Sequence, residues 1–105
     1  METHDIVIGR GGDSLLGRVL DPRFTILSSF GSVTVETKRI QWIHFRNPPQ
    51  QAQDEMWCNE SDRLSGELQG HEVKFKPVSG ATMTIPYTAV HTLIVNQFMN
   101  PGLRL

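Results

Sequence analysis

The second half of this chain nearly repeats the first, and this constrains the fold more than any other sequence feature. The segment Gly12 to Gly17 (GDSLLG) returns forty-nine positions later as Ser61 to Gly66 (SDRLSG). Each copy of such a repeat is one supersecondary unit that buries its apolar face against its neighbour. With one residue inserted after Gly80, the aligned pairs are Asp13/Asp62, Leu15/Leu64, Gly17/Gly66, Gly31/Gly80, Thr34/Thr84, Val35/Ile85, Ile40/Val90, Ile43/Leu93 and Phe45/Val95.

The length of the chain indicates that the two copies share a core or an interface. A chain of 105 residues is about one ordinary domain and buries roughly two thirds of its unfolded surface. Two independent domains of about fifty residues would need disulfides or a metal to be stable. Cys58 is the single cysteine, so an intrachain disulfide is excluded.

Charge and hydropathy set the broad class of protein. Ten basic and eleven acidic residues give a net charge of -1, which provides no strong field for nucleic acid or a membrane surface. The polar start of the chain lacks the features of a secretory signal, and no apolar stretch has the length of a membrane span. These features predict a soluble, cytoplasmic protein.

The apolar residues follow a period of two and are rich in β-branched and aromatic types, which predicts strands rather than helices. Thr37 to Arg39 suits a single 3₁₀ turn, and the run Ile40 to Phe45 is apolar on both faces, so we expect it in the middle of the assembly. The predicted strands are Ile6 to Arg10, Leu15 to Leu20, Phe24 to Phe30, Val33 to Glu36, Ile40 to Phe45, Met56 to Cys58, Leu64 to Leu68, Val73 to Phe75, Thr82 to Ile85 and Val90 to Val95.

The proline-containing polar segment 47–55 is the predicted linker between the copies. It separates a first β repeat at residues 1–46 from a second at residues 56–95, and residues 96–105 form a C-terminal tail that is frayed unless it docks. We therefore predict an all-β chain of two tandem, pseudo-symmetric, five-stranded antiparallel units. The units form either two small barrels or one shared barrel or sandwich.

The pattern of the first unit resembles the small five-stranded barrel of Sm-like proteins. It has a strand, a glycine turn, Gly12 followed by Gly17 on a second strand, Asp21 soon after, and three more strands with a tight turn before the last. The resemblance covers Ile6 to Phe45 and, with Ser61 in the place of the first glycine, Met56 to Val95. It implies assembly into rings through edge strands and binding of single-stranded RNA.

Chemically versatile residues show no catalytic, cofactor or metal signature, so we predict none of these sites. The four histidines (His4, His44, His71 and His91) lack the spacing of metal ligands. Cys58 is interpreted as a small buried hydrophobe, and Asp13 and Asp62 as turn residues whose carboxylates cap backbone amides. Gly11 and Gly12 precede no Lys-Ser/Thr and no helix, so they form no phosphate loop.

Two tryptophans flank the linker, Trp42 before it and Trp57 after it, close to Phe45 and Met56. Aromatic residues of this size could seal the contact between the units, which is the interpretation we favour. The alternative is an exposed groove or a subunit interface, where tryptophan is enriched.

The function predicted from these features is a non-enzymatic interaction or assembly module that self-associates, or binds a partner protein, through edge strands. The first alternative is a single-stranded RNA-binding protein of Sm-like type, using Lys74, Phe75, Lys76, Arg10 and Arg23. The second is a small-molecule-binding protein or enzyme with a barrel-mouth site near His44, His91 and Asp62. Lysines on an edge strand would instead discourage stray pairing, and we favour that role for Lys74 and Lys76.

Overall fold

A computed structural model describes the backbone of residues 2–99 and the side chains of residues 4–95. The all-β prediction is confirmed, because every predicted strand is present and the described part of the chain has no α-helix. The elements are β1 (Glu2–Gly9), β2 (Ser14–Val19), β3 (Arg23–Ser28), β4 (Gly31–Glu36), η1 (Thr37–Arg39), β5 (Ile40–His44), β6 (Asp54–Cys58), β7 (Arg63–Leu68), β8 (Glu72–Pro77), β9 (Met83–Pro86), η2 (Tyr87–Ala89) and β10 (Val90–Met99).

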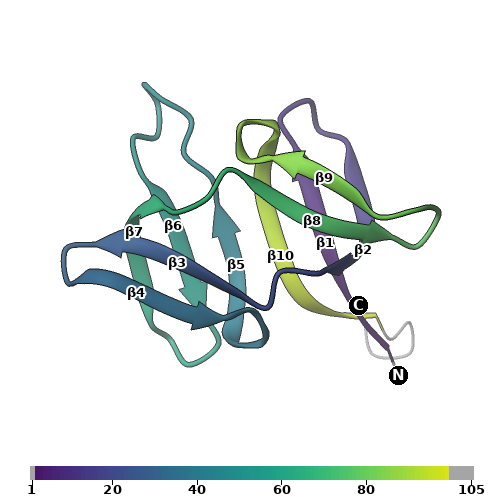
Figure 1. Cartoon of the computed structure of the whole chain (residues 1–105), viewed down its shortest axis with the longest axis horizontal. Helices are drawn as coiled ribbons and strands as arrows, with labels where there is room; N and C mark the ends of the chain where they lie inside the picture. The colour runs from purple at the N-terminus through teal and green to yellow at the C-terminus, as the bar shows by residue number, and fades with distance from the viewer. Residues whose placement is uncertain (1, 100–105) are drawn as a thin grey trace.

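All ten strands belong to one curled sheet, in the order β4-β3-β7-β6-β5-β10-β1-β2-β8-β9. Every pairing is antiparallel. Strand β5 lies in the middle, as its apolar faces predict. The two lobes in Figure 1 each combine both halves of the chain. One lobe contains β3, β4 and β5 of the first half with β6 and β7 of the second. The other contains β8, β9 and β10 of the second half with β1 and β2 of the first. The two sequence units therefore share one sheet instead of forming separate ones.

The strand order has an internal regularity. Exchanging each strand with the one five places away in the chain, such as β4 with β9 and β3 with β8, gives the same order read from the other end of the sheet. At the centre, β5 and β10 place the aligned residues Ile43 and Leu93 opposite each other. That the halves arose from one duplicated unit stays a prediction. The predicted tail begins later than expected, since β10 continues to Met99 and pairs with β1, and residues 100–105 lie outside the described residues.

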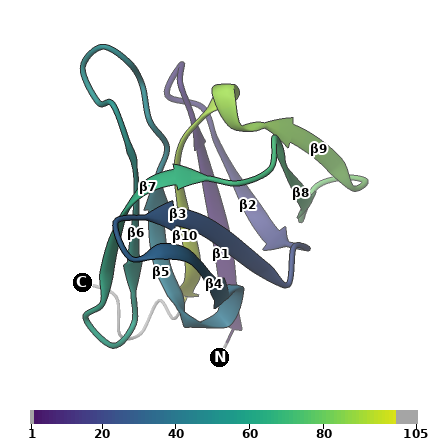
Figure 2. The ribbon, with the colours of Figure 1, turned by 60° about the vertical axis from the view of Figure 1, so that its left-hand side comes forward.

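The repeated glycines Gly17 and Gly66 lie where strands from the two halves of the chain approach each other. A Cβ on Gly66 would stand 1.9 Å from the Leu27 carbonyl oxygen, and one on Gly17 would stand 2.2 Å from the Lys76 carbonyl oxygen. Only glycine leaves room for this backbone approach. It lets β7 pair with β3, which crosses in front of β5 in Figure 2, and lets β2 pair with β8.

One hydrophobic core fills the inside of the curl and draws on both halves of the chain. Phe45 and Met56 belong to it, whereas Trp42 and Trp57 do not, so the favoured interpretation of the tryptophans is wrong. Because side chains alternate along a strand, the two indoles lie on the opposite face from Ile43 and Met56, half-buried against each other with ring centroids 5.5 Å apart. The core residues are Val7, Val19, Phe24, Ile26, Ile40, Ile43, Phe45, Met56, Leu68, Val73, Phe75, Ile85, Val90, Leu93 and Val95.

Candidate functional site

The sheet ends in two edge strands, β4 at one end and β9 at the other. Each pairs with only one neighbour in the described structure, β4 with β3 and β9 with β8. An edge strand presents a row of unpaired N–H and C=O groups that can accept another strand. The two sheet ends are therefore the natural places to look for a binding surface.

A groove of about 530 Å³ lies beside the β4 edge. Its apolar wall comes from Val33 and Val35 on the inward face of β4, together with Cys58 and Leu64. Phe30, in the turn between β3 and β4, stands at its rim with 85% of its surface exposed. We call this feature the β4 groove. It offers an apolar cleft alongside a free strand edge.

The charged side chains of the β4 groove leave an unbalanced negative charge. Arg39 is paired with Glu60. Arg63 is drawn outward, 4.7 Å from the Trp57 ring and 3.9 Å from a Glu55 carboxylate oxygen. Among the described residues, the carboxylates of two further groove residues, Glu36 and Asp62, form no ion pair.

Burial and nearby charges both act on the thiol of Cys58. Burial is the main cause that raises its pKa above the ordinary value of 9.0, followed by the charge of Asp62. Arg39 lowers this pKa and Glu60 raises it again. A thiol with a raised pKa is protonated at neutral pH and is therefore a weak nucleophile. Cys58 is only partly buried, in the wall of the β4 groove, so the prediction of a buried residue is wrong.

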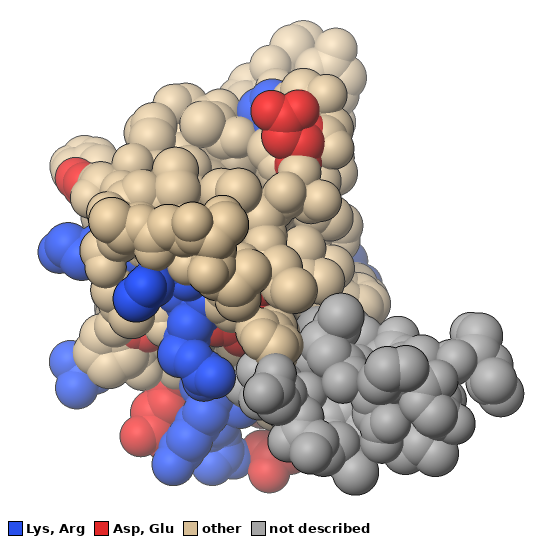
Figure 3. Space-filling model, turned by 90° about the vertical axis from the view of Figure 1, so that its right-hand side faces the viewer, with Lys and Arg blue, Asp and Glu red and all other residues tan. Residues whose placement is uncertain are grey.

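The other end of the sheet carries basic side chains. Arg18 on β2 and Lys76 on β8 are exposed and directly opposite each other in the strand register. Lys74 is exposed on the same face of β8, together with Glu72. Further acidic groups lie among these residues, since the Asp21 carboxylate accepts from the Lys74 backbone N–H at 2.9 Å and Arg18 lines a hollow with Asp21 and Glu36. Figure 3 views this side of the molecule and shows Lys and Arg side chains on its lower left, with Asp and Glu side chains among and below them. We call Arg18, Lys74 and Lys76 the basic end.

Exposed aliphatic groups accompany the basic end. Val78, in the turn between β8 and β9, is 64% exposed, and Met83 on the edge strand is 39% exposed. Leu20 and Val78 also line a shallow hollow of about 230 Å³ with Arg18 and Lys76. The lysines lie on β8 rather than at the edge, since β9 covers it, so the prediction that they guard an edge strand is wrong.

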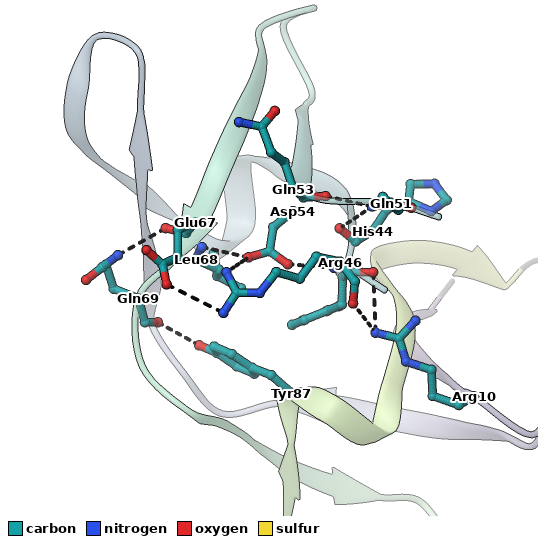
Figure 4. Close-up of polar contacts among 11 residues, drawn as sticks. Arg10, His44, Arg46, Gln51, Gln53, Asp54, Glu67, Leu68, Gln69 and Tyr87 are labelled. Carbon is teal, nitrogen blue, oxygen red and sulfur yellow. Dashed lines mark hydrogen bonds and ion pairs between the residues drawn. The ribbon is translucent and has the colours of Figure 1, made fainter. Parts of the chain in front are cut away.

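A second polar cluster surrounds Asp54 and has a structural role. The backbone N–H groups of Leu68 and Arg46 each donate to its carboxylate at 2.7 Å, and Arg46 Nη1 donates at 3.3 Å (Figure 4). Tyr87 donates from its hydroxyl to the Gln69 carbonyl oxygen at 2.9 Å. Together these bonds fasten β6, the segment after β5, the end of β7 and η2, and they leave Asp54 committed to protein partners.

The structure does not bring together the residues that either alternative function requires. His44 and His91 lie together, with ring centroids 6.2 Å apart, but Asp62 lines the β4 groove with Cys58 instead. Phe75 is fully buried, so of the run Lys74 to Lys76 only the lysines face solvent.

Two other predicted residues also have structural surroundings. Arg10 donates to the backbone carbonyl groups of Thr88, Phe45 and Arg46, and Arg23 lies exposed opposite Glu36. The hairpins at Asp13 and Asp62 are closed by the backbone carbonyls of these residues, which accept from the N–H groups of Gly9 and Cys58, and neither carboxylate accepts a hydrogen bond from the described residues. Their predicted capping role is therefore wrong.

Sequence reasoning missed the β4 groove, because Phe30, Val33, Cys58 and Asp62 are brought together only by the pairing of β7 with β3. Comparisons with family models, curated proteins and solved structures return no match to this chain. Within the described residues no helix is long and apolar enough to cross a membrane. No group of three or more His, Cys, Asp or Glu side chains in that part of the chain could hold a metal ion.

Proposed function

We propose that this protein is a non-enzymatic interaction and assembly module that self-associates through its edge strands. The observation that carries the proposal is the sheet order, which leaves β4 and β9 each with one side unpaired by any other described strand. A strand added at such an edge gains main-chain hydrogen bonds, and pockets for alternate side chains give specificity.

Exposed apolar side chains accompany both edges and support this function. Phe30 stands at the rim of the β4 groove, and Val78 and Met83 stand at the β9 end. Monomeric proteins usually blunt their edge strands with charges, proline or a covering segment. Strand β9 has a single proline, Pro86, at its end, and β4 has its one charge, Glu36, at its end, so the middle of each strand is free.

The resemblance to Sm-like proteins, which assemble through edge strands, stays a prediction and agrees with this function. Cytoplasmic localisation is part of the same proposal. RNA binding has less support in the positions of the side chains, because bases bind single-strand-binding surfaces by stacking on exposed aromatic rings, and Phe75 is buried.

Light scattering coupled to size-exclusion chromatography tests the proposal. We expect the mass to rise above the 11.9 kDa of one chain as the protein concentration rises. Amide hydrogen exchange should slow in β4 and β9 at high protein concentration. It should not change in the central strands β5 and β10, which are already paired on both sides. A mass that stays at one chain, with unchanged exchange in both edges, would eliminate the function.

Matched variants locate the contact. Met83→Lys places a charge on the β9 edge and should reduce association. Gln50→Lys adds the same charge to an exposed loop away from both edges and should leave association unchanged. Equal effects of the two substitutions would show that the edge is not involved.

A further inference from the structure

The two halves of the chain, β1 to β5 and β6 to β10, are joined along a seam of paired strands. Five of the nine pairs among the described strands cross between the halves: β3 with β7, β5 with β6, β5 with β10, β1 with β10, and β2 with β8. We call these five pairs the seam. Within each half, the described strands pair only as two separate hairpins. A half therefore completes a sheet only with strands from another half.

The seam has the same register on both sides of its centre. Ile43 of β5 lies opposite Met56 of β6, and Leu93 of β10 lies opposite Val7 of β1. Leu93 is the residue aligned with Ile43, and Met56 stands forty-nine positions after Val7. The two central crossings are therefore built from corresponding residues.

The two outer crossings correspond in the same way. Leu27 of β3 lies opposite Glu67 of β7, and Lys76 of β8 lies opposite Arg18 of β2. Lys76 stands forty-nine positions after Leu27, and Glu67 stands forty-nine positions after Arg18. Each half thus presents to the other the strand positions that it also receives.

The two halves also bury corresponding residues. The buried carboxylates of Asp5 and Asp54 each accept a backbone N–H at 2.7 Å, from Val19 and Leu68 respectively. Interfaces in which the same surface patch serves both partners are typical of symmetric dimers. The core contains seven pairs of residues at corresponding positions: Val7/Met56, Val19/Leu68, Phe24/Val73, Ile26/Phe75, Ile40/Val90, Ile43/Leu93 and Phe45/Val95.

One loop connects the halves. It spans residues 46–53, projects beyond the ends of β5 and β6 in Figure 1, and contributes no residue to the core. The loop is closed by Asn47 and Gln51, whose N–H and carbonyl groups bond in both directions at 2.8 and 3.0 Å. Opening it breaks these two bonds and leaves the strand pairs within each half intact.

We propose that two copies of this chain associate by exchanging halves, so that β1 to β5 of one copy pair with β6 to β10 of the other. The structure shows what covers each surface, because the second half of the same chain occupies it. A second copy supplies that half unchanged, so the exchanged dimer remakes every contact of the seam and loses only the closed loop. Exchange of an identical element is a low-cost route to a dimer. This inference goes beyond the association proposed above, because it uses the seam and not the edges β4 and β9.

Cysteine pairs across the seam test the exchange in the full-length chain. Leu27 is 46% exposed and Glu67 is also exposed, so Leu27→Cys and Glu67→Cys should leave the fold intact. The two variants are made separately, each with Cys58→Ser so that no native thiol remains. They are mixed in urea, refolded at rising protein concentration, and then treated with oxidised glutathione. In an exchanged dimer the two introduced thiols lie opposite each other, at a separation that a disulfide spans.

Two controls calibrate the cross-link. A single chain with both Leu27→Cys and Glu67→Cys should form an intrachain disulfide, which shows that the two positions can be linked. Leu27→Cys mixed with Gln50→Cys measures random linking, because Gln50 is exposed in the loop and has no place in the seam. We expect the covalent two-chain product of the matched pair to exceed this background several-fold and to rise with protein concentration.

A product that stays at the background level at every concentration would show that the halves do not exchange. Should the first pair fail to fold or to link, Arg18→Cys and Lys76→Cys replace it, since both residues are exposed and opposite each other at the other outer crossing. The result leaves the proposed function to its own test, because edge association forms without refolding and reverses on dilution. Separation of an exchanged dimer requires unfolding, so its mass should persist after dilution, and prompt return to one chain would also contradict the exchange.

Discussion

Replacing Asp54 by asparagine should cost more stability than an isosteric change at any other carboxylate in the ion pairs of the described residues. Asp54 is 3% exposed, and its carboxylate accepts from the backbone N–H groups of Leu68 and Arg46 and from the Arg46 guanidinium. The substitution leaves no cavity, because asparagine and aspartate side chains have nearly the same size and shape. The difference lies in hydrogen bonding, since an asparagine amide can accept through one oxygen only.

The magnitude follows from the bonds that are lost. One buried backbone N–H would face an NH₂ group and stay unsatisfied, which costs about 1–3 kcal/mol. Loss of the negative charge weakens the remaining bonds, since hydrogen bonds to charged groups contribute about 1.5–3 kcal/mol and neutral ones about 0.5–1.5 kcal/mol. We expect a loss of about 3 kcal/mol in the free energy of unfolding, or roughly 10–20 °C in Tm for a domain of this size.

Urea unfolding followed by circular dichroism measures this loss. Glu67→Gln is the matched control, because the Glu67 side chain is 60% exposed and lies 3.6 Å from Arg46 in an ion pair open to solvent. That substitution should change stability by less than about 1 kcal/mol. If Asp54→Asn is as mild as Glu67→Gln, the carboxylate does not hold β6 and β7 together and the reasoning is refuted.

Three further predictions concern the glycine approach, the tyrosine and the cysteine. Gly66→Ala should destabilise the protein by more than about 2 kcal/mol in urea unfolding, because its Cβ would overlap the Leu27 carbonyl. The control Gly80→Ala, whose Cβ would have nothing within 4 Å, should change stability by no more than about 0.5 kcal/mol. Equal effects of the two substitutions would contradict the close approach at Gly66. Burial, followed by the charges of Asp21 and Asp54, raises the pKa of Tyr87 from 10.0 to about 12, so the folded state holds the proton more tightly than the unfolded state. The stability that this group contributes is therefore complete below pH 10 and is lost as the pH rises toward 12, and Tyr87→Phe should remove that decline. Tyr87 is the only tyrosine in the sequence, so an ultraviolet titration of the protein measures its pKa directly. A midpoint near 10 would refute the assignment. Cys58 should react with iodoacetamide more slowly in the folded protein than in urea, and Asp62→Asn should speed the folded reaction by lowering the thiol pKa, so an unchanged rate would place Asp62 away from the thiol.

The positions of the strands could be predicted from the sequence because strand formation leaves a local signal. Alternation of apolar and polar residues with β-branched types identified each strand, and the apolar run Ile40 to Phe45 correctly indicated a central position. The tryptophans could not be placed in the same way. Trp42 and Ile43 are neighbours in the chain but face opposite sides of the sheet, and the core takes Ile43.

The candidate site shows the same division between local and distant information. Lys74 and Lys76 were predicted to lie on the solvated face of an edge strand, and both are exposed, but β9 covers β8, so neither lies at the edge. Asp62 was recognised as a turn residue. Its position beside Cys58 and β4 requires β7 to pair with β3 of the other half of the chain.

The sequence by itself determined that the chain is all-β, where its strands and turns lie, and which positions recur in its two halves. An apolar period of two residues indicates which side chains share a face of a strand, and a glycine or proline indicates where a strand ends. Only the tertiary structure decided that strands are exchanged between the halves, that β4 and β9 end the sheet, and that a groove opens beside β4. Pairing between distant segments depends on how well whole faces pack together, which no local pattern records.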